Sequence, residues 1–226
     1  MIDTVLLDVD DTLLDFTLGE RTALRLAFDE LELPYAEDTA EVYHVFNNIW
    51  WARYERGEVE RENLLWMRFA DLLDHYGLTS DPKVLAKCYE GHLTEQHCFI
   101  EGATDFIARL RPRRLYAVSN GNANVQKKRL QDSGLIDLLD GAFVSEAVGY
   151  HKPQKEYFDV VFSRIPDFNI DRTILVGDSL SSDIQGGINA GLRTILYDRE
   201  GKTPEAVKPD YHCHSFDEVV KVIESL

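Results

Sequence analysis

The sequence is poor in cysteine, in basic residues and in long apolar runs. Its three cysteines, Cys88, Cys98 and Cys213, are widely spaced and match neither a zinc motif nor a disulfide framework. This usage favours a reducing compartment, so we expect a cytoplasmic protein. No apolar stretch approaches the roughly 20 residues that span a bilayer. The chain also does not open on a basic segment followed by an apolar stretch, and we therefore expect neither a membrane contact nor a signal peptide.

The shortage of basic residues limits the partners that the chain can bind. Lysine and arginine total 24 against 40 aspartates and glutamates, which gives a formal net charge of −16. Such a charge disfavours binding to polymeric nucleic acid, because the phosphate backbone would be repelled. A single nucleotide stays compatible, since one phosphate needs only local positive charge. The 226 residues, 44% of them hydrophobic, are enough for one full core and a smaller second domain.

Three carboxylates and a threonine follow an apolar run near the start of the chain. The run Val5-Leu6-Leu7 reads as a buried strand and leads into Asp8-Val9-Asp10-Asp11-Thr12. Burying carboxylates is costly unless a cation or solvent compensates them. A site for a hard cation such as Mg²⁺ at the carboxyl end of a sheet strand would meet that need. The alternative is a strand that runs into an acidic surface turn.

Helical periodicity follows for about eighty residues. Four helices are predicted between residues 16 and 95, on apolar faces formed by Leu24, Ala27, Phe28 and Leu31, by Val42, Val45, Phe46 and Ile49, and by Leu65, Phe69, Leu72, Leu73 and Tyr76, with the fourth opening at Asp81-Pro82. The aromatic residues of this segment are expected to lie mostly in its core, and Trp50 and Trp51 cannot both face inward.

From about residue 100 short apolar runs alternate with helical segments. This alternation predicts an α/β fold whose parallel sheet carries helices on both faces, and the first strand must join that sheet. We therefore predict a Rossmann-like core from residues 1–15 and 96–226, with an inserted all-α cap domain at residues 16–95. An insertion directly after the carboxylate-bearing strand is expected to cover the carboxyl ends of the strands, where it would exclude water from a site.

Three further motifs follow the first one in order. They are Val118-Ser119-Asn120-Gly121, Gly149-Tyr150-His151-Lys152-Pro153, and Val176-Gly177-Asp178-Ser179-Leu180-Ser181-Ser182-Asp183. With these four motifs the chain resembles the haloacid dehalogenase-like hydrolase superfamily over its whole length. The variant Asp-Val-Asp-Asp-Thr-Leu, with Asp11 where many members carry glycine, is similar to the pyrimidine and noncanonical 5′-nucleotidase branch.

The resemblance implies phosphoryl transfer through an aspartyl-phosphate. In that scheme Asp8 is the nucleophile, and Asp10 protonates the leaving oxygen and later activates water. Mg²⁺ would be the cofactor, bound by the Asp8 carboxylate, the Asp10 carbonyl and Asp178, while Asp183 would act from outside the direct ligands. The resemblance implies phosphate binding by Ser119, Asn120 and Lys152, with Lys152 as the counter-charge for Asp8.

The residues themselves agree with parts of this scheme and leave alternatives open. Asp8 and Asp10 point the same way if the backbone stays extended, and Thr12 is expected to fix the following turn by bonding to backbone. Gly177 permits a close backbone approach beside Asp178. Read alone, Asp178 and Asp183 could be an acidic pair at a helix N-terminus, Ser119 or Asn120 a helix cap, and Lys152 a surface residue.

The short run His212-Cys213-His214 could suggest a metal site. Alternation from Tyr211 to Ser215 instead predicts an edge strand with both histidines on one face. Zinc needs further ligands that the neighbouring sequence does not supply, so no metal site is predicted here.

The function predicted from the sequence is a Mg²⁺-dependent phosphomonoesterase that acts on a small phosphorylated metabolite. Nucleoside 5′-monophosphates, and among them pyrimidine ones, are the expected substrates because of the branch that the chain resembles. The alternatives are a sugar-phosphate or other small-metabolite phosphatase, a phosphomutase, and a non-catalytic Mg²⁺- or phosphate-binding interaction protein. We expect a monomer or a small homo-oligomer.

Overall fold

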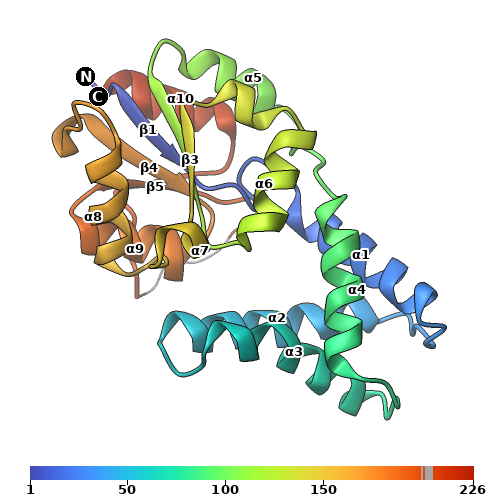
Figure 1. Ribbon diagram of the computed structural model, residues 1–226. Helices are drawn as coiled ribbons and strands as arrows, with labels where there is room; N and C mark the ends of the chain where they lie inside the picture. The colour runs from blue at the N-terminus through green and yellow to red at the C-terminus, as the bar shows by residue number, and fades with distance from the viewer. Residues whose placement is uncertain (200, 202–205) are drawn as a thin grey trace. The chain divides into compact units, whose positions relative to one another are not determined.

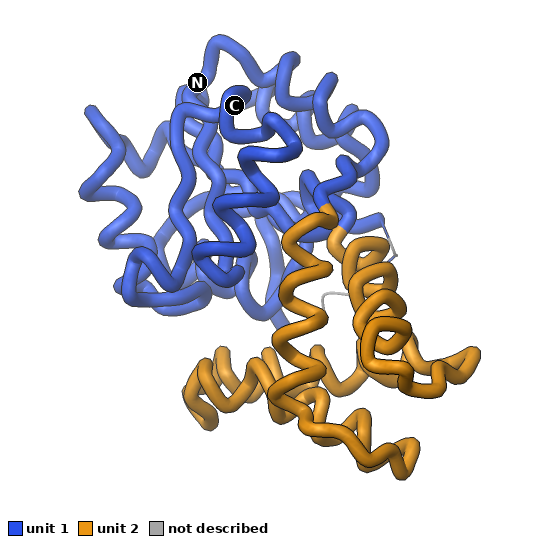
Figure 2. Tube along the Cα trace, turned by 45° about the vertical axis from the view of Figure 1, so that its right-hand side comes forward, with its two compact units in different colours: residues 1–15, 97–226 blue, residues 16–96 orange. Residues whose placement is uncertain are grey.

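The computed structural model describes residues 1–199, 201 and 206–226, and the chain divides into two compact units. Residues 1–15 and 97–226 form one unit, here called the sheet unit, and residues 16–96 form the other, the helical unit (Figure 2). Within the described ranges, no helix combines the length and the apolar character needed to cross a membrane.

The sheet unit is built on six parallel strands in the order β3-β2-β1-β4-β5-β6 (Figure 1). The strands are β1 (Thr4–Leu7), β2 (Arg114–Ser119), β3 (Gly141–Val144), β4 (Thr173–Gly177), β5 (Arg193–Tyr197) and β6 (Tyr211–Cys213). The chain adds β2 and β3 on one side of β1, then crosses back to add β4, β5 and β6 on the other. The strand order therefore reverses at β1, which is where open α/β sheets bind their ligands. The predicted Rossmann-like α/β class is confirmed.

Strand β1 lies in the middle of the sheet, between β2 and β4. Its four residues are all buried, and Leu7 is in register with Ala117 on one side and Val176 on the other. A continuous apolar run of this kind is typical of a parallel strand covered on both faces. Val5 and Leu7 belong to one core cluster and Leu6 to another, so alternate side chains support opposite layers.

Helices cover both faces of the sheet. Residues of α5 (Ala103–Leu110) and α10 (Phe216–Ser225) belong to the core cluster of Val5 and Leu7, whereas residues of α8 (Lys155–Arg164) and α9 (Gln185–Ala190) belong to that of Leu6. The remaining elements of this unit are α6 (Ala123–Asp132), α7 (Ser145–Val148), the 3₁₀ turns η1 (Leu135–Leu138) and η2 (Ile170–Arg172), and the π-helical turn η3 (Leu180–Ile184).

The helical unit consists of α1 (Phe16–Glu30), α2 (Thr39–Glu55), α3 (Arg61–His75) and α4 (Pro82–Thr94). Asp81 caps α4 as predicted, because its side chain accepts a hydrogen bond from the Lys83 backbone N–H. Three rings from α2, α3 and α4, those of Tyr43, Phe69 and Tyr89, meet with centroids 5.0 to 5.4 Å apart and fill the centre of the unit.

The predicted inner face of α2 was wrong. Val45 and Ile49 are 56% and 48% exposed, while Tyr43, Asn47 and Trp50 are buried. Apolar residues surround most of this helix, so periodicity alone could not choose between the faces. The tyrosine and tryptophan rings take the inner face because they bury more area than the aliphatic side chains.

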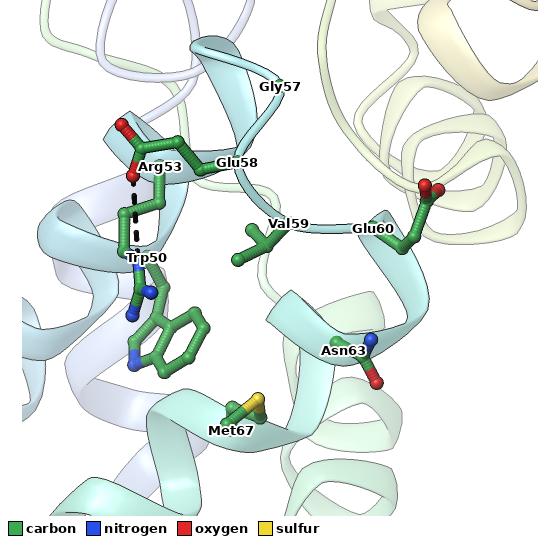
Figure 3. Close-up of a pocket in the computed structure, with 8 residues that line it drawn as sticks. All are labelled: Trp50, Arg53, Gly57, Glu58, Val59, Glu60, Asn63 and Met67. Atoms are coloured by element: carbon green, nitrogen blue, oxygen red, sulfur yellow. Dashed lines mark ion pairs between the residues drawn. The ribbon is translucent and has the colours of Figure 1, made fainter.

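A hollow of about 290 Å³ lies at the turn between α2 and α3 (Figure 3). Trp50 lines it, the Arg53 guanidinium lies 4.5 Å from the centre of the Trp50 ring, and the indole N–H donates to Asp71 at 2.6 Å.

Trp51 is half-buried, so the two neighbouring tryptophans do face differently, as predicted. The expectation concerned six aromatic residues, Phe46, Trp50, Trp51, Tyr54, Trp66 and Phe69. It was too broad, because only Trp50 and Phe69 among them are buried.

Candidate active site

Side chains from four loops meet at the carboxyl edge of the sheet. Asp8 follows β1, Asp178 follows β4, and Asp183 lies in η3. The Asp8 backbone N–H donates to the carbonyl of Val176 at 2.9 Å, which extends the pairing of β1 with β4 by one residue. One carboxylate oxygen from each of the three aspartates lies within 4.8 Å of the others. Topology therefore brings Asp8 to two aspartates that lie 170 and 175 positions later in the sequence (178 − 8 and 183 − 8).

Lys152 is the counter-charge of this cluster. Its ammonium donates to Asp8 Oδ1 at 2.6 Å, to Asp183 Oδ1 at 2.6 Å and to the Val118 carbonyl at 2.9 Å. These three bonds use all three protons of the group. The residue is only 1% exposed, which excludes the alternative of a surface lysine. The peptide bond that joins Lys152 to Pro153 is cis, and helix α8 begins two residues after that proline, at Lys155, and not at the proline itself.

Burial and neighbouring charges shift the pKa values of Asp8 and Lys152 for different reasons. Burial raises the pKa of Asp8 well above its usual value, and the Asp183 carboxylate raises it further, while the ammonium of Lys152 opposes the rise without cancelling it. Burial by itself would lower the pKa of Lys152, but the carboxylates of Asp183 and Asp8 outweigh burial and the pKa is raised. Lys152 is therefore held charged, whereas its ammonium does not offset the effects of burial and of Asp183 on Asp8.

Asp183 is fixed by contacts on both of its oxygens. Oδ1 accepts from Lys152, and Oδ2 accepts from the Ser179 backbone N–H at 3.1 Å. A Cβ at Gly177 would lie 2.3 Å from Asp183 Cγ, closer than any real side chain tolerates. The predicted close approach at Gly177 is thus confirmed, and its physical reason is the space taken by the Asp183 carboxylate.

Asp10 lies in a different setting from Asp8. Its Oδ1 accepts from an Arg129 NH group at 2.5 Å, and its Oδ2 accepts from the Gln126 amide at 2.7 Å. Arg129 and Gln126 are each 1% exposed, and the same Arg129 nitrogen also donates to Gln126 Oε1 at 2.7 Å. Sequence reasoning missed both residues of α6. A basic residue in a helix that also carries lysines is usually predicted to be solvated. The sequence indicated burial of Gln126 and Arg129 only through their apolar neighbours Val125 and Leu130, which mark the buried face of the helix.

Ser119 and Asn120 do not cap the following helix. Asn122 is the cap of α6, since its side chain accepts from the N–H groups of Asn124 and Val125. The Ser119 hydroxyl accepts from the Gly121 N–H at 3.0 Å and from the Gln126 amide at 2.7 Å, which ties it to the network of Asp10.

The side-chain amide of Asn120 is paired with the backbone of Lys152. It donates to the Lys152 carbonyl and accepts from the Lys152 N–H, both at 2.8 Å. Two bonds to one residue fix the orientation of the loop that carries the ammonium. The Asn120 side chain therefore bonds to the backbone of Lys152.

The turn after β1 is held by backbone bonds and not by Thr12. The N–H groups of Leu13 and Leu14 both donate to the Val9 carbonyl at 2.9 Å, whereas the buried Thr12 hydroxyl has no hydrogen-bond partner among the described residues. The predicted role of Thr12 was wrong. Asp11 has φ of +57°, a left-handed conformation that favours glycine, and its carboxylate lies 3.6 Å from the Arg199 guanidinium.

The donor set at this edge fits a hard divalent cation. Four carboxylates, those of Asp8, Asp10, Asp178 and Asp183, face two cationic side chains, those of Lys152 and Arg129. The excess of two formal negative charges matches one divalent ion, and carboxylate oxygens are the ligands that Mg²⁺ prefers. Burial and the neighbouring Asp183 carboxylate raise the pKa of Asp8, and a cation beside Asp8 would lower it.

Comparison with known proteins agrees with this arrangement. The family model of the haloacid dehalogenase-like hydrolases matches residues 2–191. The HAD-hydrolase YfnB of Bacillus subtilis is 41% identical over 223 residues, covering 97% of this chain and 94% of the relative. The pyrimidine 5′-nucleotidases PynA of Streptococcus pneumoniae and YjjG of Escherichia coli are 31% and 29% identical over 223 residues. They cover 97% and 98% of this chain, and 94% and 97% of their own lengths.

A solved structure extends the comparison to three dimensions. The crystal structure of B. subtilis YfnB superposes with a TM-score of 0.94 at 40% identity and covers 98% of each chain. That structure is described as bound to magnesium and as revealing interdomain movement. Fold and sequence therefore point to the same group of proteins.

Proposed function

The chain belongs to the haloacid dehalogenase-like hydrolase family, and we propose that it is a Mg²⁺-dependent phosphomonoesterase with Asp8 as its nucleophile. One observation carries the proposal: two nearby carboxylates are held in two different ways. Asp8 is buried against the Lys152 ammonium, while Asp10 is bound on both oxygens by Arg129 and Gln126. Pairs of acids in unlike settings are typical of sites that divide nucleophilic and proton-transfer roles.

In the first proposed step, a carboxylate oxygen of Asp8 attacks phosphorus. The bond between phosphorus and the ester oxygen breaks, and the leaving oxygen takes a proton from Asp10. In the second step, water attacks phosphorus of the aspartyl-phosphate, gives a proton to Asp10 and restores the Asp8 carboxylate. Both oxygens of Asp10 accept hydrogen bonds in the structure, which fixes the orientation of the carboxylate that exchanges the proton in both steps.

The residues around Asp8 have supporting roles in this proposal. Lys152 and the Ser119 hydroxyl would bind the oxygens of the transferring phosphoryl group, and Asn120 would position Lys152. Mg²⁺ would be held by Asp8 and Asp178, and would neutralise charge on the phosphoryl group. Both oxygens of Asp183 already accept hydrogen bonds, which supports an indirect role for this residue at the metal.

We infer the substrate class from the names of the relatives, and we infer that the helical unit is the cap from its place in the chain. PynA and YjjG are named as pyrimidine 5′-nucleotidases, which supports nucleoside 5′-monophosphates as the substrates of this chain. The helical unit is inserted between β1 and β2, directly after Asp8 and Asp10, and this position in the chain supports its role as the cap.

Phosphate release from a panel of substrates tests the proposal. The panel contains pyrimidine and purine 5′-monophosphates, sugar phosphates and small phosphate esters, each with Mg²⁺ and with chelator. We expect turnover that chelator abolishes and that is highest on pyrimidine 5′-monophosphates. Chelator-sensitive turnover concentrated on sugar phosphates would keep the mechanism and reject the substrate class. A complete lack of turnover would favour a non-catalytic protein that binds Mg²⁺ or phosphate.

A further inference from the structure

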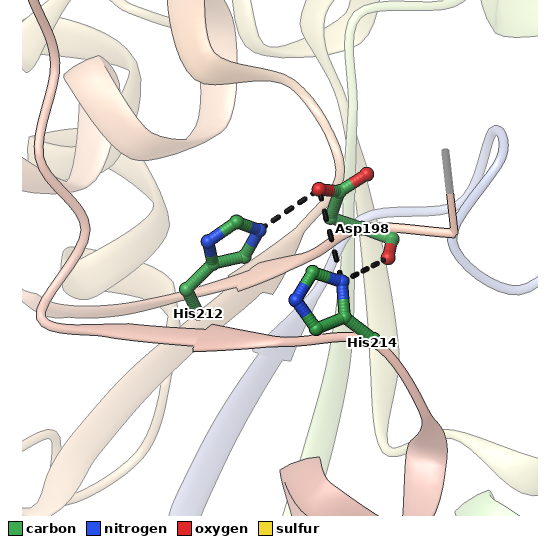
Figure 4. Close-up of side chains that lie close together, drawn as sticks. All are labelled: Asp198, His212 and His214. Carbon is green, nitrogen blue, oxygen red and sulfur yellow. Dashed lines mark hydrogen bonds and ion pairs between the residues drawn. The ribbon is translucent and has the colours of Figure 1, made fainter. Parts of the chain in front are cut away.

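A second cluster of metal-binding side chains lies at the edge of the sheet between β5 and β6. Asp198, His212 and His214 meet there, with one donor atom of each within 4.8 Å of the others (Figure 4). The Nε2 atom of His212 lies 2.8 Å from Asp198 Oδ2. His214 Nδ1 hydrogen-bonds the Asp198 backbone carbonyl at 3.0 Å and lies 3.9 Å from Oδ2 (Figure 4). The two imidazole rings are 4.6 Å apart between centroids.

The pairing of the two strands explains why these residues meet. Leu196 and Tyr197 are in register with His212 and Cys213, and the Asp198 N–H donates to the Cys213 carbonyl at 2.8 Å. Asp198 is therefore placed beside the end of β6. The expectation that the histidines lack a third donor is therefore wrong, because Asp198, which directly follows β5 and lies 14 residues before His212, supplies one.

The period of the strand separates the donors from the one thiol nearby. His212 in β6 and His214, directly after it, lie on one side of the chain, whereas Cys213 belongs to the core and is 2% exposed. Burial raises the pKa of the Cys213 thiol to about 11, so a thiolate is not part of the donor set. The donors are two imidazole nitrogens and one carboxylate oxygen.

Burial and exposure are distributed in this cluster as a metal site requires. The Asp198 side chain is fully buried, while those of His212 and His214 are 28% and 57% exposed. The carboxylate is oriented by the Gly201 N–H, which donates to Oδ1 at 2.8 Å and leaves Oδ2 on the side of the histidines. The exposed histidines give the donor atoms access to solvent. Binding of a shared ion would require His214 Nδ1 to exchange its bond with the Asp198 carbonyl for the ion.

We propose that Asp198, His212 and His214 form a second metal site that binds a divalent transition-metal ion such as Zn²⁺. Two histidines and one carboxylate are a donor set that zinc accepts, with water in the fourth position. Imidazole donors favour zinc-like ions, whereas the three-carboxylate cluster favours Mg²⁺, so the two sites differ in the ion that they select. The bound ion would link the ends of β5 and the short edge strand β6.

Zinc titration of the full chain tests the site independently of any catalytic activity. Calorimetry is performed with excess Mg²⁺ to occupy the carboxylate cluster, on the wild type and on the variants His212→Gln, His214→Gln and Asp198→Asn. His75→Gln, an exposed histidine of α3, is the matched control. We expect one equivalent of Zn²⁺ to bind, with affinity lowered about tenfold or more in each ligand variant and unchanged in the control.

Two further measurements decide between the possible sites. Asp178→Asn should keep zinc binding, and loss of binding in that variant would place zinc in the carboxylate cluster and overturn the proposal. Circular dichroism in chelator shows whether each ligand variant is folded, and Co²⁺ added to the wild type should give visible d–d absorption that is altered in His214→Gln. Equal zinc affinity in the folded ligand variants, or no saturable binding by the wild type, would show that the cluster is only a hydrogen-bonded tie.

Discussion

Both units bury a network of charged and polar side chains, but the formal charges of carboxylates and cations are equal in number only in the network of the helical unit. In the helical unit, buried Glu20 accepts from His44 and Asn47, and Asn47 accepts from Arg68. One carboxylate and one guanidinium are thus joined through an amide. In the sheet unit, four carboxylates face the two cations Lys152 and Arg129, and the pKa of Asp8 is raised. Burial of charge alone therefore does not mark a site, whereas uncompensated burial indicates a ligand.

The largest effect is expected from the nucleophile. Asp8→Asn should lower phosphate release by more than about a thousandfold, because the amide cannot form the aspartyl-phosphate. Steady-state assays with Mg²⁺ check this. Asp11→Asn is the matched control, since Asp11 lies three residues away in the same turn and is paired with Arg199. Activity of Asp8→Asn comparable with that of the control would contradict the covalent mechanism.

Two buried arginines allow the comparison between the units to be tested directly. Arg129→Met should lower kcat about 10- to 100-fold with little change in KM, because Asp10 loses its cationic partner. Arg68→Met should leave kcat unchanged and cost about 1–3 kcal/mol of stability, since the buried Asn47 carbonyl loses its donor. Kinetics and denaturant unfolding of both variants separate these effects. The same kinetic loss in both would show that the networks do not differ in function.

The pH dependence of stability tests the uncompensated charge of Asp8. Its pKa is raised in the fold above the ordinary value of 3.8, so its stabilising contribution is complete below that value and is lost as the pH rises through the folded pKa. The deprotonated carboxylate is the form that binds metal. Mg²⁺ should therefore raise the melting temperature more at about pH 7.5 than at about pH 5.

Thermal melts with Mg²⁺ and with chelator at both pH values measure this difference. In Asp8→Asn the Mg²⁺ effect should shrink and should no longer depend on pH in this way. An equal Mg²⁺ effect at the two pH values in the wild type would contradict the view that Asp8 is the group short of positive charge.

The smallest effect is expected at Asp11, which adjoins the cluster but has a cation of its own. Asp11→Gly relieves the left-handed backbone and removes a half-exposed ion pair with Arg199, and these changes oppose each other. Stability should change by less than about 1 kcal/mol and kcat by less than about twofold. A large loss of activity would show that the Asp11 carboxylate is part of the active site.

Sequence reasoning succeeded where local pattern and strand order were enough. The apolar run before Asp8 and the alternation after residue 100 predicted the sheet, and parallel strands necessarily bring Asp8 and Asp178 to one edge. It failed where a partner comes from another element without a local signal. Arg129 reads as a surface residue of a helix that also carries two lysines, and Asp198 lies 14 residues before His212, so neither contact follows from spacing.

The helical unit shows a second limit of the sequence. Its helices were evident from periodicity, but α2 carries apolar residues on most of its surface, and only packing decides that Tyr43 and Trp50 are inside while Val45 is outside. Thr12 illustrates the same point on a smaller scale. A threonine in a turn usually bonds to backbone, yet here the backbone closes the turn by itself.

The most direct test of the central claim is to trap the phosphorylated side chain. The enzyme is mixed with its best substrate, quenched within one turnover and treated with borohydride, which reduces an acyl phosphate to the alcohol. Peptide mass spectrometry should then find homoserine at position 8 in the wild type, and none in Asp8→Asn or without substrate. Turnover with no modification at position 8, or with the modification on another carboxylate, would contradict the assignment of Asp8 as the nucleophile.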